Sequence, residues 1–255
     1  MTSPACRPRS PAARPTGSSG GAPRPVEVKG RFEDLSKCKL VEGYGLTESS
    51  PVATCNPLYG VNKTASIGIP LPRTHVEIRD PETGEPVVGG ARGEICVSGP
   101  QVMQGYWQRE KETAEAIVDG HLRTGDIGFM DDDGYVFLID RIKDLILVGG
   151  FNVYPRNVEE ALYEHEAVAE AIVIGVPDEI RGQVVKAFVK LGEGKTVTAE
   201  KLNAFLDTRI GRHEMPKEIE FRDQLPKTLV GKLSKKELVE EETAKYEAKR
   251  RAVAN

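Results

Sequence analysis

The stretch DRIKDLILVGGFNVYP, residues Asp140–Pro155, says more about the fold of this chain than any other part of its sequence. An apolar run, Leu145–Val148, ends at Gly149 and Gly150, a pair that favours a tight turn. Pro155 follows where a helix can begin, since its missing N–H costs nothing in the first helical turn. The stretch therefore predicts a hairpin with a Gly-Gly turn and, directly after it, a helix.

Apolar periodicity on both sides of this stretch predicts an α+β fold, in which a β-rich part is followed by a small C-terminal α+β domain. Alternating apolar and polar residues between turn-rich segments indicate strands, and apolar residues at helical spacing indicate helices. The strands are expected over His75–Arg79, Glu94–Ser98, Tyr135–Ile139, Leu145–Val148, Ala169–Val176, Val184–Leu191 and Ile219–Phe221. The helices are expected over Pro155–His165, after a Thr198 cap, and after a capping box of Ser234 and Glu237.

Composition and charge place the chain among ordinary globular proteins. Hydrophobic residues make up 39% and charged residues 29% of the sequence, and the net charge is −4. This acidic balance argues against nucleic-acid binding, which needs a basic surface. The four cysteines form no CxxC pair and have no nearby histidine at metal-ligand spacing, so we expect reduced thiols in a cytoplasmic protein. No apolar run is long enough to span a bilayer, whereas peripheral membrane contact and the oligomeric state stay open.

The beginning of the chain differs in composition from the rest. Its first 25 residues hold six prolines and four arginines and no acidic residue. Prolines break the amphipathic helix of a transit peptide, and the apolar core of a secretory signal is missing. We therefore expect residues 1–18 to be disordered, with globular sequence from Ser19 onward.

Three further short motifs carry residues of chemical interest. GYGLTE, Gly43–Glu48, combines a Gly-Tyr-Gly turn, which can offer an aromatic face to a planar base, with a carboxylate that can hold Mg²⁺ beside phosphates. RTGD, Arg123–Asp126, ends in a carboxylate that only accepts hydrogen bonds and so suits two hydroxyl donors. LPKTLVGK, Leu225–Lys232, ends in a lysine whose compact charge can bring two anions together. Taken singly, the first two also fit ordinary turns.

The four motifs, in this order, resemble the adenylate-forming (AMP-dependent) acyl-CoA synthetase and ligase family, and most of all its bacterial long-chain-fatty-acid–CoA ligases. The resemblance covers about residues 19–245 and matches the C-terminal half of the family. The family's phosphate loop, a Ser/Thr/Gly-rich stretch ending in Pro-Lys-Gly, does not occur in the sequence. The resemblance implies that residues 19–142 are the remnant of the large AMP-binding domain, with its β-rich subdomain, and that residues 143–255 are the mobile C-terminal domain.

The same resemblance implies roles for individual residues. The implied nucleotide-binding residues are Gly21, Ala22, Pro23, Tyr44, Gly45, Thr47, Asp126, Arg141 and Asn152. The implied catalytic residues are Lys232, Glu48 and Thr47, with Glu48 also the ligand of Mg²⁺. Lys143 takes the place of the hinge about which the C-terminal domain swings, and Gly149 and Gly150 line the path of CoA. Gly105–Trp107 also matches a family segment, where we expect packing rather than function.

The reaction that the resemblance implies is the ATP-dependent ligation of a fatty acid to CoA, with a long-chain fatty acid as the expected substrate. The carboxylate and ATP give acyl-AMP and pyrophosphate, and the thiol of CoA then attacks the acyl group. ATP, Mg²⁺ and CoA are the expected cofactors and co-substrates. Two alternatives stay open, namely an enzyme of the same chemistry that loads a carrier protein, and a fragment that is inactive.

Overall fold

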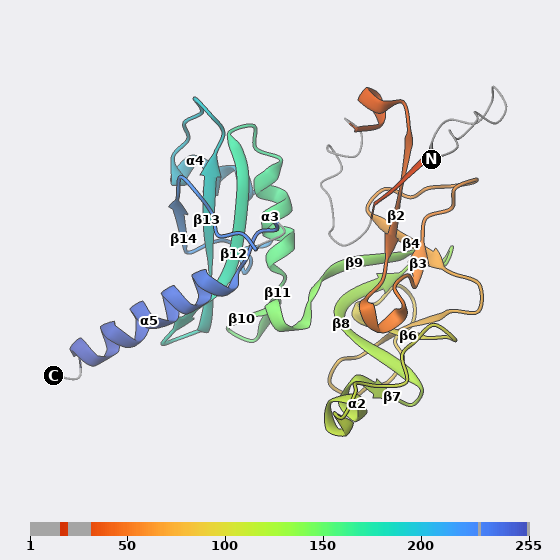
Figure 1. Ribbon diagram of the computed structural model, residues 1–255. Helices are drawn as coiled ribbons and strands as arrows, with labels where there is room; N and C mark the ends of the chain where they lie inside the picture. Colours follow the sequence, from red (N-terminus) through yellow and green to blue (C-terminus); the bar gives the residue numbers. More distant parts are fainter. Residues whose placement is uncertain (1–15, 20–31, 229–230, 254–255) are drawn as a thin grey trace, which may run out of the picture. The chain divides into compact units, whose positions relative to one another are not determined.

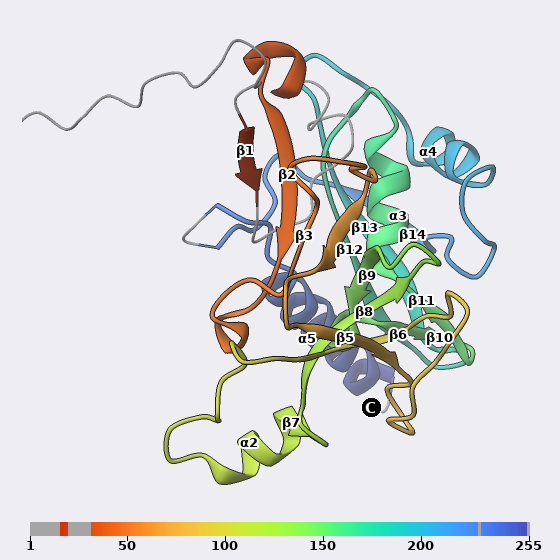
Figure 2. The ribbon, with the colours of Figure 1, turned by 90° about the vertical axis from the view of Figure 1, so that its right-hand side faces the viewer.

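The computed structural model describes residues 16–19, 32–228 and 231–253, and its fold is α+β, as the sequence predicts. The chain divides into two compact units. Unit 1 consists of Met1–Thr124 and Gly128–Leu138, and unit 2 consists of Gly125–Ile127 and Ile139–Asn255. Each unit is built around a β-sheet, which can be followed in Figures 1 and 2.

The sheet of unit 1 runs in the order β1-β2-β3-β4-β9-β8-β6-β5, with β7 paired to β8. β1 lies parallel to β2, whereas the pairs β2–β3, β3–β4, β4–β9 and β5–β6 are antiparallel. The bounds of the strands are β1 Thr16–Ser19, β2 Lys39–Tyr44, β3 Thr54–Cys55, β4 Ser66–Pro70, β5 His75–Arg79, β6 Gly93–Ser98, β7 Ile117–Val118, β8 His121–Met130 and β9 Val136–Arg141. The unit also contains a 3₁₀ turn, η1 (Thr47–Ser49), and a short helix, α2 (Glu110–Ala116).

The core of unit 1 gathers apolar side chains from several of these strands. Its buried members are Tyr44, Ala53, Ile78, Ile95, Val97 and Val136. One buried residue of β6 is charged: Glu94 is 3% exposed, and its carboxylate lies 2.8 Å from the guanidinium of Arg123. A buried carboxylate without such a partner would be very costly, so this ion pair makes the burial of Glu94 tolerable.

The sheet of unit 2 runs in the order β11-β10-β13-β12, and β14 pairs in parallel with β13 (Figure 1). The long strands β12 and β13 form an antiparallel pair. The strand bounds are β10 Ile146–Val148, β11 Phe151–Val153, β12 Val168–Asp178, β13 Gly182–Leu191 and β14 Glu218–Phe221. The helical elements are η2 Ile142–Asp144, α3 Pro155–Tyr163, α4 Ala199–Leu206 and α5 Lys236–Val253. Among the described helices, none is long and apolar enough to cross a membrane.

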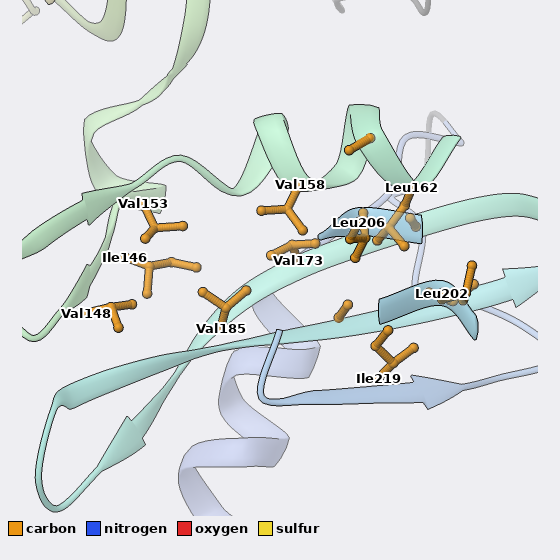
Figure 3. Close-up of a cluster of buried hydrophobic side chains, with 14 residues drawn as sticks. Ile146, Val148, Val153, Val158, Leu162, Val173, Val185, Leu202, Leu206 and Ile219 are labelled. Atoms are coloured by element: carbon orange, nitrogen blue, oxygen red, sulfur yellow. The ribbon is translucent and has the colours of Figure 1, made fainter. Parts of the chain in front are cut away.

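The main core of unit 2 lies between its sheet and the apolar sides of α3 and α4. Figure 3 shows Val158 and Leu162 of α3 directed toward the strands, where Val173 and Val185 belong to the same buried cluster. Burial of a Val or Leu side chain stabilises by roughly 1.5–3 kcal/mol, so this cluster is a main source of the unit's stability. Its members are Ile146, Val148, Val153, Val158, Ala161, Leu162, Ala171, Val173, Val185, Ala187, Val189, Leu202, Leu206 and Ile219.

Most elements expected from the sequence are confirmed, with small changes at their ends. β5 has its predicted bounds, and Thr198 caps α4 by accepting a hydrogen bond from the backbone N–H of Lys201 at 3.4 Å. α3 ends at Tyr163 rather than His165. α5 begins at Lys236, one residue later than the Ser234 cap would set. Helix ends commonly fray by one or two residues, which accounts for both differences.

The disorder expected over residues 1–18 is wrong for its last three residues. Thr16–Ser18 belong to β1, which pairs in parallel with β2, Thr16 opposite Lys39 and Ser18 opposite Val41. A backbone ladder to a distant strand can order a segment whose own composition offers no apolar burial, and composition alone does not register such a ladder. Residues 1–15 lie outside the described part of the chain.

Helix α5 is joined to the sheet by a buried lysine on β13. Lys186 is 3% exposed. Its Nζ lies 3.0, 2.9 and 3.0 Å from carboxylate oxygens of Glu218, Glu220 and Glu242. Burial alone would lower the pKa of Lys186, but hydrogen bonds to the three carboxylates outweigh it and raise the pKa. Because the partners come from β14 and α5, one ammonium group connects a strand, its neighbour and a helix.

Replacing Lys186 by methionine should destabilise unit 2 by up to about 3 kcal/mol, because buried carboxylates then lose their buried partner. The carboxylate most affected is that of Glu242, whose side chain is 10% exposed and which keeps only Lys245, a 53% exposed partner whose Nζ lies 2.8 Å from its Oε1. Native-state hydrogen exchange at the backbone amide of Phe188 measures the effect. Lys236→Met is the control, since that side chain is 82% exposed and 3.9 Å from its partner. Equal exchange in both variants would contradict this role for Lys186.

A second prediction concerns the stability of unit 2 at low pH. The Arg222 guanidinium donates to both carboxylate oxygens of Glu241, at 2.9 and 2.7 Å. Hydrogen bonds from Arg222 and Lys245 lower the pKa of Glu241 from 4.5 to about 2. A lowered carboxyl pKa gives stability that is present above the unfolded value and is lost as the pH falls through the folded value. We therefore expect Arg222→Gln to destabilise near neutral pH and the difference from wild type to shrink toward pH about 2. Urea unfolding across this range tests it, and a difference that does not change with pH would argue against it.

Candidate nucleotide site

The GYGLTE motif forms the end of β2 and the turn η1. Ser49, which is fully buried, holds this turn together. Its hydroxyl accepts a hydrogen bond from the backbone N–H of Leu46 at 2.9 Å and lies 3.0 Å from the carbonyl oxygens of Leu46 and Pro51. Ser49 was not predicted from the sequence, although a serine three residues after the start of a turn is a known local partner for the backbone. Thr47 is exposed on the turn, and Glu48 is half-buried.

Two residues of this motif have structural roles of their own. A Cβ at Gly45 would lie 1.7 Å from the carbonyl oxygen of Pro51, so the close approach of the chain to itself requires glycine there. Tyr44 is 9% exposed and belongs to the core of unit 1. The nucleotide-binding roles of Tyr44, Gly45 and Thr47 stay predictions.

Glu48 is fixed by Tyr106, a residue for which the sequence suggested packing. The Tyr106 hydroxyl donates to Oε1 of Glu48 at 2.9 Å, and this hydrogen bond raises the pKa of the tyrosine. The backbone N–H of Tyr106 in turn donates to the hydroxyl of Thr113 in α2 at 2.9 Å. Trp107 is 87% exposed, so the packing expected for this residue is wrong. Tyr106 thus orients the carboxylate of the GYGLTE motif.

The structure brings Asp126 and Arg141 together in the stretches of β8 and β9 that belong to unit 2. Asp126 lies on β8 and is 6% exposed, and its Oδ1 is 3.4 Å from Nε of Arg141 on β9. The arginine side chain is 60% exposed, so only one partner of this pair is buried. Two motifs that are separate in the sequence, RTGD and DRIKD, therefore meet across neighbouring strands.

Asp140 connects this pair to α3. Its Oδ1 accepts a hydrogen bond from the backbone N–H of Arg141, and its Oδ2 accepts one from Arg156, both at 2.8 Å. Arg156 is the second residue of α3, where backbone N–H groups have no partner inside the helix. Asp140 is therefore a distant N-terminal cap, 16 residues before the N–H that it accepts. No local spacing rule could have found it, because capping patterns in sequence extend over about three residues.

The hinge candidate and the paired glycines lie next along the chain. Lys143 is exposed in η2. Gly149 and Gly150 have φ of 57° and 88° and form the two-residue turn between β10 and β11, which confirms the predicted hairpin. Both φ values are positive, as a type I′ turn requires, and a Cβ at either position would meet open space. The turn by itself explains both glycines, and their place on a CoA path stays a prediction, as does the role of Asn152, which is exposed on β11.

Lys232 lies on a separate loop of unit 2, where its side chain is exposed. Its carbonyl oxygen accepts a hydrogen bond from the backbone N–H of Thr228 at 2.7 Å, and its own N–H donates to the Thr228 hydroxyl at 3.2 Å. Gly21, Ala22 and Pro23, the remaining nucleotide candidates, lie outside the described residues. The candidates that are described form one group in unit 1, around Glu48, and a set in unit 2 that includes the Asp126–Arg141 pair.

Two domain families match the chain. The AMP-binding enzyme family matches residues 7–107, and the C-terminal domain of AMP-binding enzymes matches residues 157–232. In these two stretches the chain is similar to AMP-binding enzymes. The first match contains the GYGLTE motif, and the second ends at Lys232.

Three individual proteins show which kinds of AMP-binding enzyme the chain resembles. The long-chain-fatty-acid–CoA ligase of Bacillus subtilis (strain 168) is 52% identical over 231 residues, which are 91% of this chain and 41% of the relative. ATP-bound MatB from Rhodopseudomonas palustris has a TM-score of 0.83 and 36% identity, covering 88% of this chain and 44% of that one. MenE of Bacillus subtilis, an o-succinylbenzoate CoA synthetase in complex with the acyl-adenylate OSB-AMP, has a TM-score of 0.79 and 31% identity, over 90% of this chain and 47% of its own. The chain thus spans less than half of each of these proteins.

The cap formed by Asp140 yields a prediction. Asp140→Ala should lower the free energy of unfolding of unit 2 by about 1–2 kcal/mol, because two backbone N–H groups lose their acceptor. Asp140→Asn keeps one carbonyl oxygen as an acceptor and should lose less. Hydrogen exchange at the Arg156 amide reports the cap directly. If alanine and asparagine gave wild-type exchange there, the capping role would be refuted.

Proposed function

We propose that this chain carries the ribose-binding pair and the adenylation lysine of an ATP-dependent fatty acid–CoA ligase, with a long-chain fatty acid as the substrate. The geometric observation that supports it most is the contact of buried Asp126 with exposed Arg141 at 3.4 Å. The substrate class is supported by the Bacillus subtilis relative, which is named a long-chain-fatty-acid–CoA ligase and is 52% identical over 231 residues.

The Asp126–Arg141 pair suits a nucleotide ribose. An ionised carboxylate is acceptor-only and can receive both hydroxyls of the sugar. Arg141 offers several N–H donors in a planar fork, and because its side chain is 60% exposed it can contact a ligand while it neutralises the aspartate. Asp140 adds rigidity, since it fixes the backbone of Arg141 to the beginning of α3.

The residues around Glu48 fit a Mg²⁺ ion that arrives with ATP. Mg²⁺ at nucleotide sites is held by one or two carboxylates together with substrate phosphates, rather than by a cage of protein ligands. Glu48 supplies one carboxylate, oriented by Tyr106, and the described residues contain no group of three or more His, Cys, Asp or Glu that could hold a metal by themselves. When bound, the ion would neutralise phosphate charge, while Thr47 on the same turn would offer its hydroxyl to a phosphate.

Lys232 is the proposed adenylation lysine. Formation of acyl-AMP brings two anions together, the fatty-acid carboxylate and the α-phosphate of ATP, and charge accumulates around phosphorus in the transition state. A positioned ammonium stabilises both situations. The exposed side chain of Lys232, on a loop with its own backbone hydrogen bonds, can play this role.

The second half of the reaction, attack by the thiol of CoA, requires a different arrangement in our proposal. We assign residues 19–142 to the large AMP-binding domain and residues 143–255 to a C-terminal domain that moves about Lys143, and this movement would break the hydrogen bond from the Arg156 N–H to Asp140. That residue is exposed in the short η2 turn between β9 and β10, and hinges are a few residues at element ends that absorb changes in backbone angle. The β10–β11 turn at Gly149 and Gly150 and the neighbouring Asn152 would then face the substrates in one of the two half-reactions.

The acyl group is the point at which related proteins differ, since MenE is named for o-succinylbenzoate. The decisive experiment is ATP–pyrophosphate exchange by this purified chain with Mg²⁺ and, in parallel, palmitate or o-succinylbenzoate. We expect exchange that depends on palmitate. ATP–pyrophosphate exchange with o-succinylbenzoate but not with palmitate would show that the substrate is an aromatic acid and not a long-chain fatty acid. If neither acid supports exchange, and none appears after the part of the Bacillus subtilis relative outside the match is added, the proposed activity is wrong for this chain.

Lys232→Ala should separate the two half-reactions. Loss of one preorganised donor typically costs on the order of 10²–10³ in turnover, so adenylation should fall by about that factor. Formation of the thioester from preformed acyl-AMP and CoA should stay near the wild-type rate. Lys236→Ala, which removes an exposed lysine of α5, is the control. Equal losses in both half-reactions would show that Lys232 is not specific for adenylation.

A further inference from the structure

Lys232 is carried by two short antiparallel arms, Pro226–Thr228 and Lys232–Ser234. Lys227 and Leu233 form a β-bridge between the arms, and the backbone N–H of Ser234 donates to the carbonyl oxygen of Pro226 at 2.9 Å. Leu233 packs against a buried cluster that includes Leu225 and Phe188. The arms are therefore attached to the body of unit 2 near their bases, while the side chain of Lys232 is exposed.

A lysine in the first arm and a lysine directly after the second arm form ion pairs with the body of unit 2. In the first arm, Nζ of Lys227 lies 2.6 Å from Oε1 of Glu170 on β12. After the second arm, Nζ of Lys235 lies 3.1 Å from Oε1 of Glu159 on α3. The two lysines flank Lys232 at distances of five and three residues along the chain. Two carboxylates from neighbouring elements thus hold the segment that presents Lys232.

The Glu159 pair is the better protected of the two. The side chains of Glu159 and Lys235 are 17% and 25% exposed, whereas that of Lys227 is 42% exposed. Glu159 Oε1 also accepts a hydrogen bond from the backbone N–H of Val173 at 2.9 Å, which fixes the carboxylate to β12. Ion pairs at exposed sites contribute little because water and salt screen them, so the shielded pair is expected to control the arms.

The surroundings of Glu159 explain why its partner matters. Burial raises the pKa of Glu159, and Lys235 together with the Val173 amide opposes this rise. Tyr163 lies one helical turn further along α3, and its hydroxyl oxygen accepts from the backbone N–H of Ala171 at 3.2 Å. A carboxylate in such a place is stabilised in its charged form chiefly by its lysine. The contact between Lys235 Nζ and Glu159 Oε1, at 3.1 Å, therefore holds the base of the second arm in place.

We propose that Glu159, through its ion pair with Lys235, is a positioning residue that orders the Lys232 arms for adenylation. Glu159 touches no substrate in this proposal and acts only through the arms. The functional part rests on the proposed function, because it assumes that Lys232 serves the first half-reaction. The structural part, that the ion pair orders the arms, holds whether or not the chain is a ligase.

The test uses Glu159→Gln in the full chain, because glutamine keeps an oxygen for the Val173 N–H and removes only the charge. Glu160→Gln is the matched control: it is the next residue of α3, its side chain is 56% exposed, and it pairs with Arg156 at 2.8 Å. We expect hydrogen exchange at the amides of Lys232 and Ser234 to become at least about tenfold faster in Glu159→Gln, since hydrogen bonds between charged groups are among the strong ones. The amide of Phe188 in β13 should keep its protection.

Lys235→Met and the double variant complete the cycle. If the ion pair carries the effect, Lys235→Met should speed exchange in the arms as much as Glu159→Gln does, and the double variant should add little to either. Unchanged exchange in the arms, or equal acceleration at Phe188, would overturn the proposal, since the second result would show a general loss of stability instead.

A kinetic measurement then tests the functional part. In a chain with measurable ATP–pyrophosphate exchange, Glu159→Gln should lower the rate of adenylation about tenfold or more and leave thioester formation from preformed acyl-AMP unchanged. Equal losses in both half-reactions would contradict positioning for adenylation. If wild type itself shows no exchange activity, the proposed function fails, and the amide measurements still decide whether Glu159 orders the arms.

Discussion

The carboxylate of Asp140 is the constraint on which the central part of this molecule depends. It accepts one N–H from Arg141, at the end of β9, and another from Arg156, in the first turn of α3. Everything between these two residues, including η2 and the β10–β11 hairpin, is thereby a closed loop with fixed ends. The α3 residues of the main core of unit 2 follow directly, beginning with Val158, so the cap sets where the helix that carries them starts. A buried acceptor with two good donors is well satisfied, whereas a buried carboxylate without them would be expensive.

Charge is used in a consistent way elsewhere in unit 2. Lys186 is surrounded by three carboxylates at the junction of β13, β14 and α5, and Arg222 binds Glu241 through two hydrogen bonds. Glu170 and Glu159 form ion pairs with Lys227 and Lys235, the lysines on either side of Lys232. In each case an ion pair fixes an element that has few apolar residues of its own. The C-terminal helix α5 illustrates the need, because Leu238 is its buried contribution to the adjacent apolar cluster.

The sequence predicted the elements whose signals are local. The alternation in His75–Arg79, the Thr198 cap and the Gly-Gly turn each act within a few residues, and each is confirmed. What it did not predict depends on contacts between distant residues. β1 is ordered by a ladder to β2, Asp140 caps a helix 16 residues away, and Tyr106 reaches Glu48 across 58 residues. The site shows the same division. The motif residues could be identified from the sequence, whereas the hydrogen bonds of Ser49 and Tyr106 that hold the GYGLTE motif in place could not.

The geometry of the β10–β11 turn has a consequence for how related sequences are interpreted. Gly149 and Gly150 both occupy the left-handed region, and open space lies where a side chain would begin. Steric closeness of a ligand is therefore not needed to explain either glycine, since the right-handed twist of the two strands already demands this turn. A homologue that has lost all chemistry would retain the pair for the sake of its hairpin. The two glycines are a marker of backbone shape, and by themselves they do not show whether a protein that carries them transfers an acyl group to a thiol.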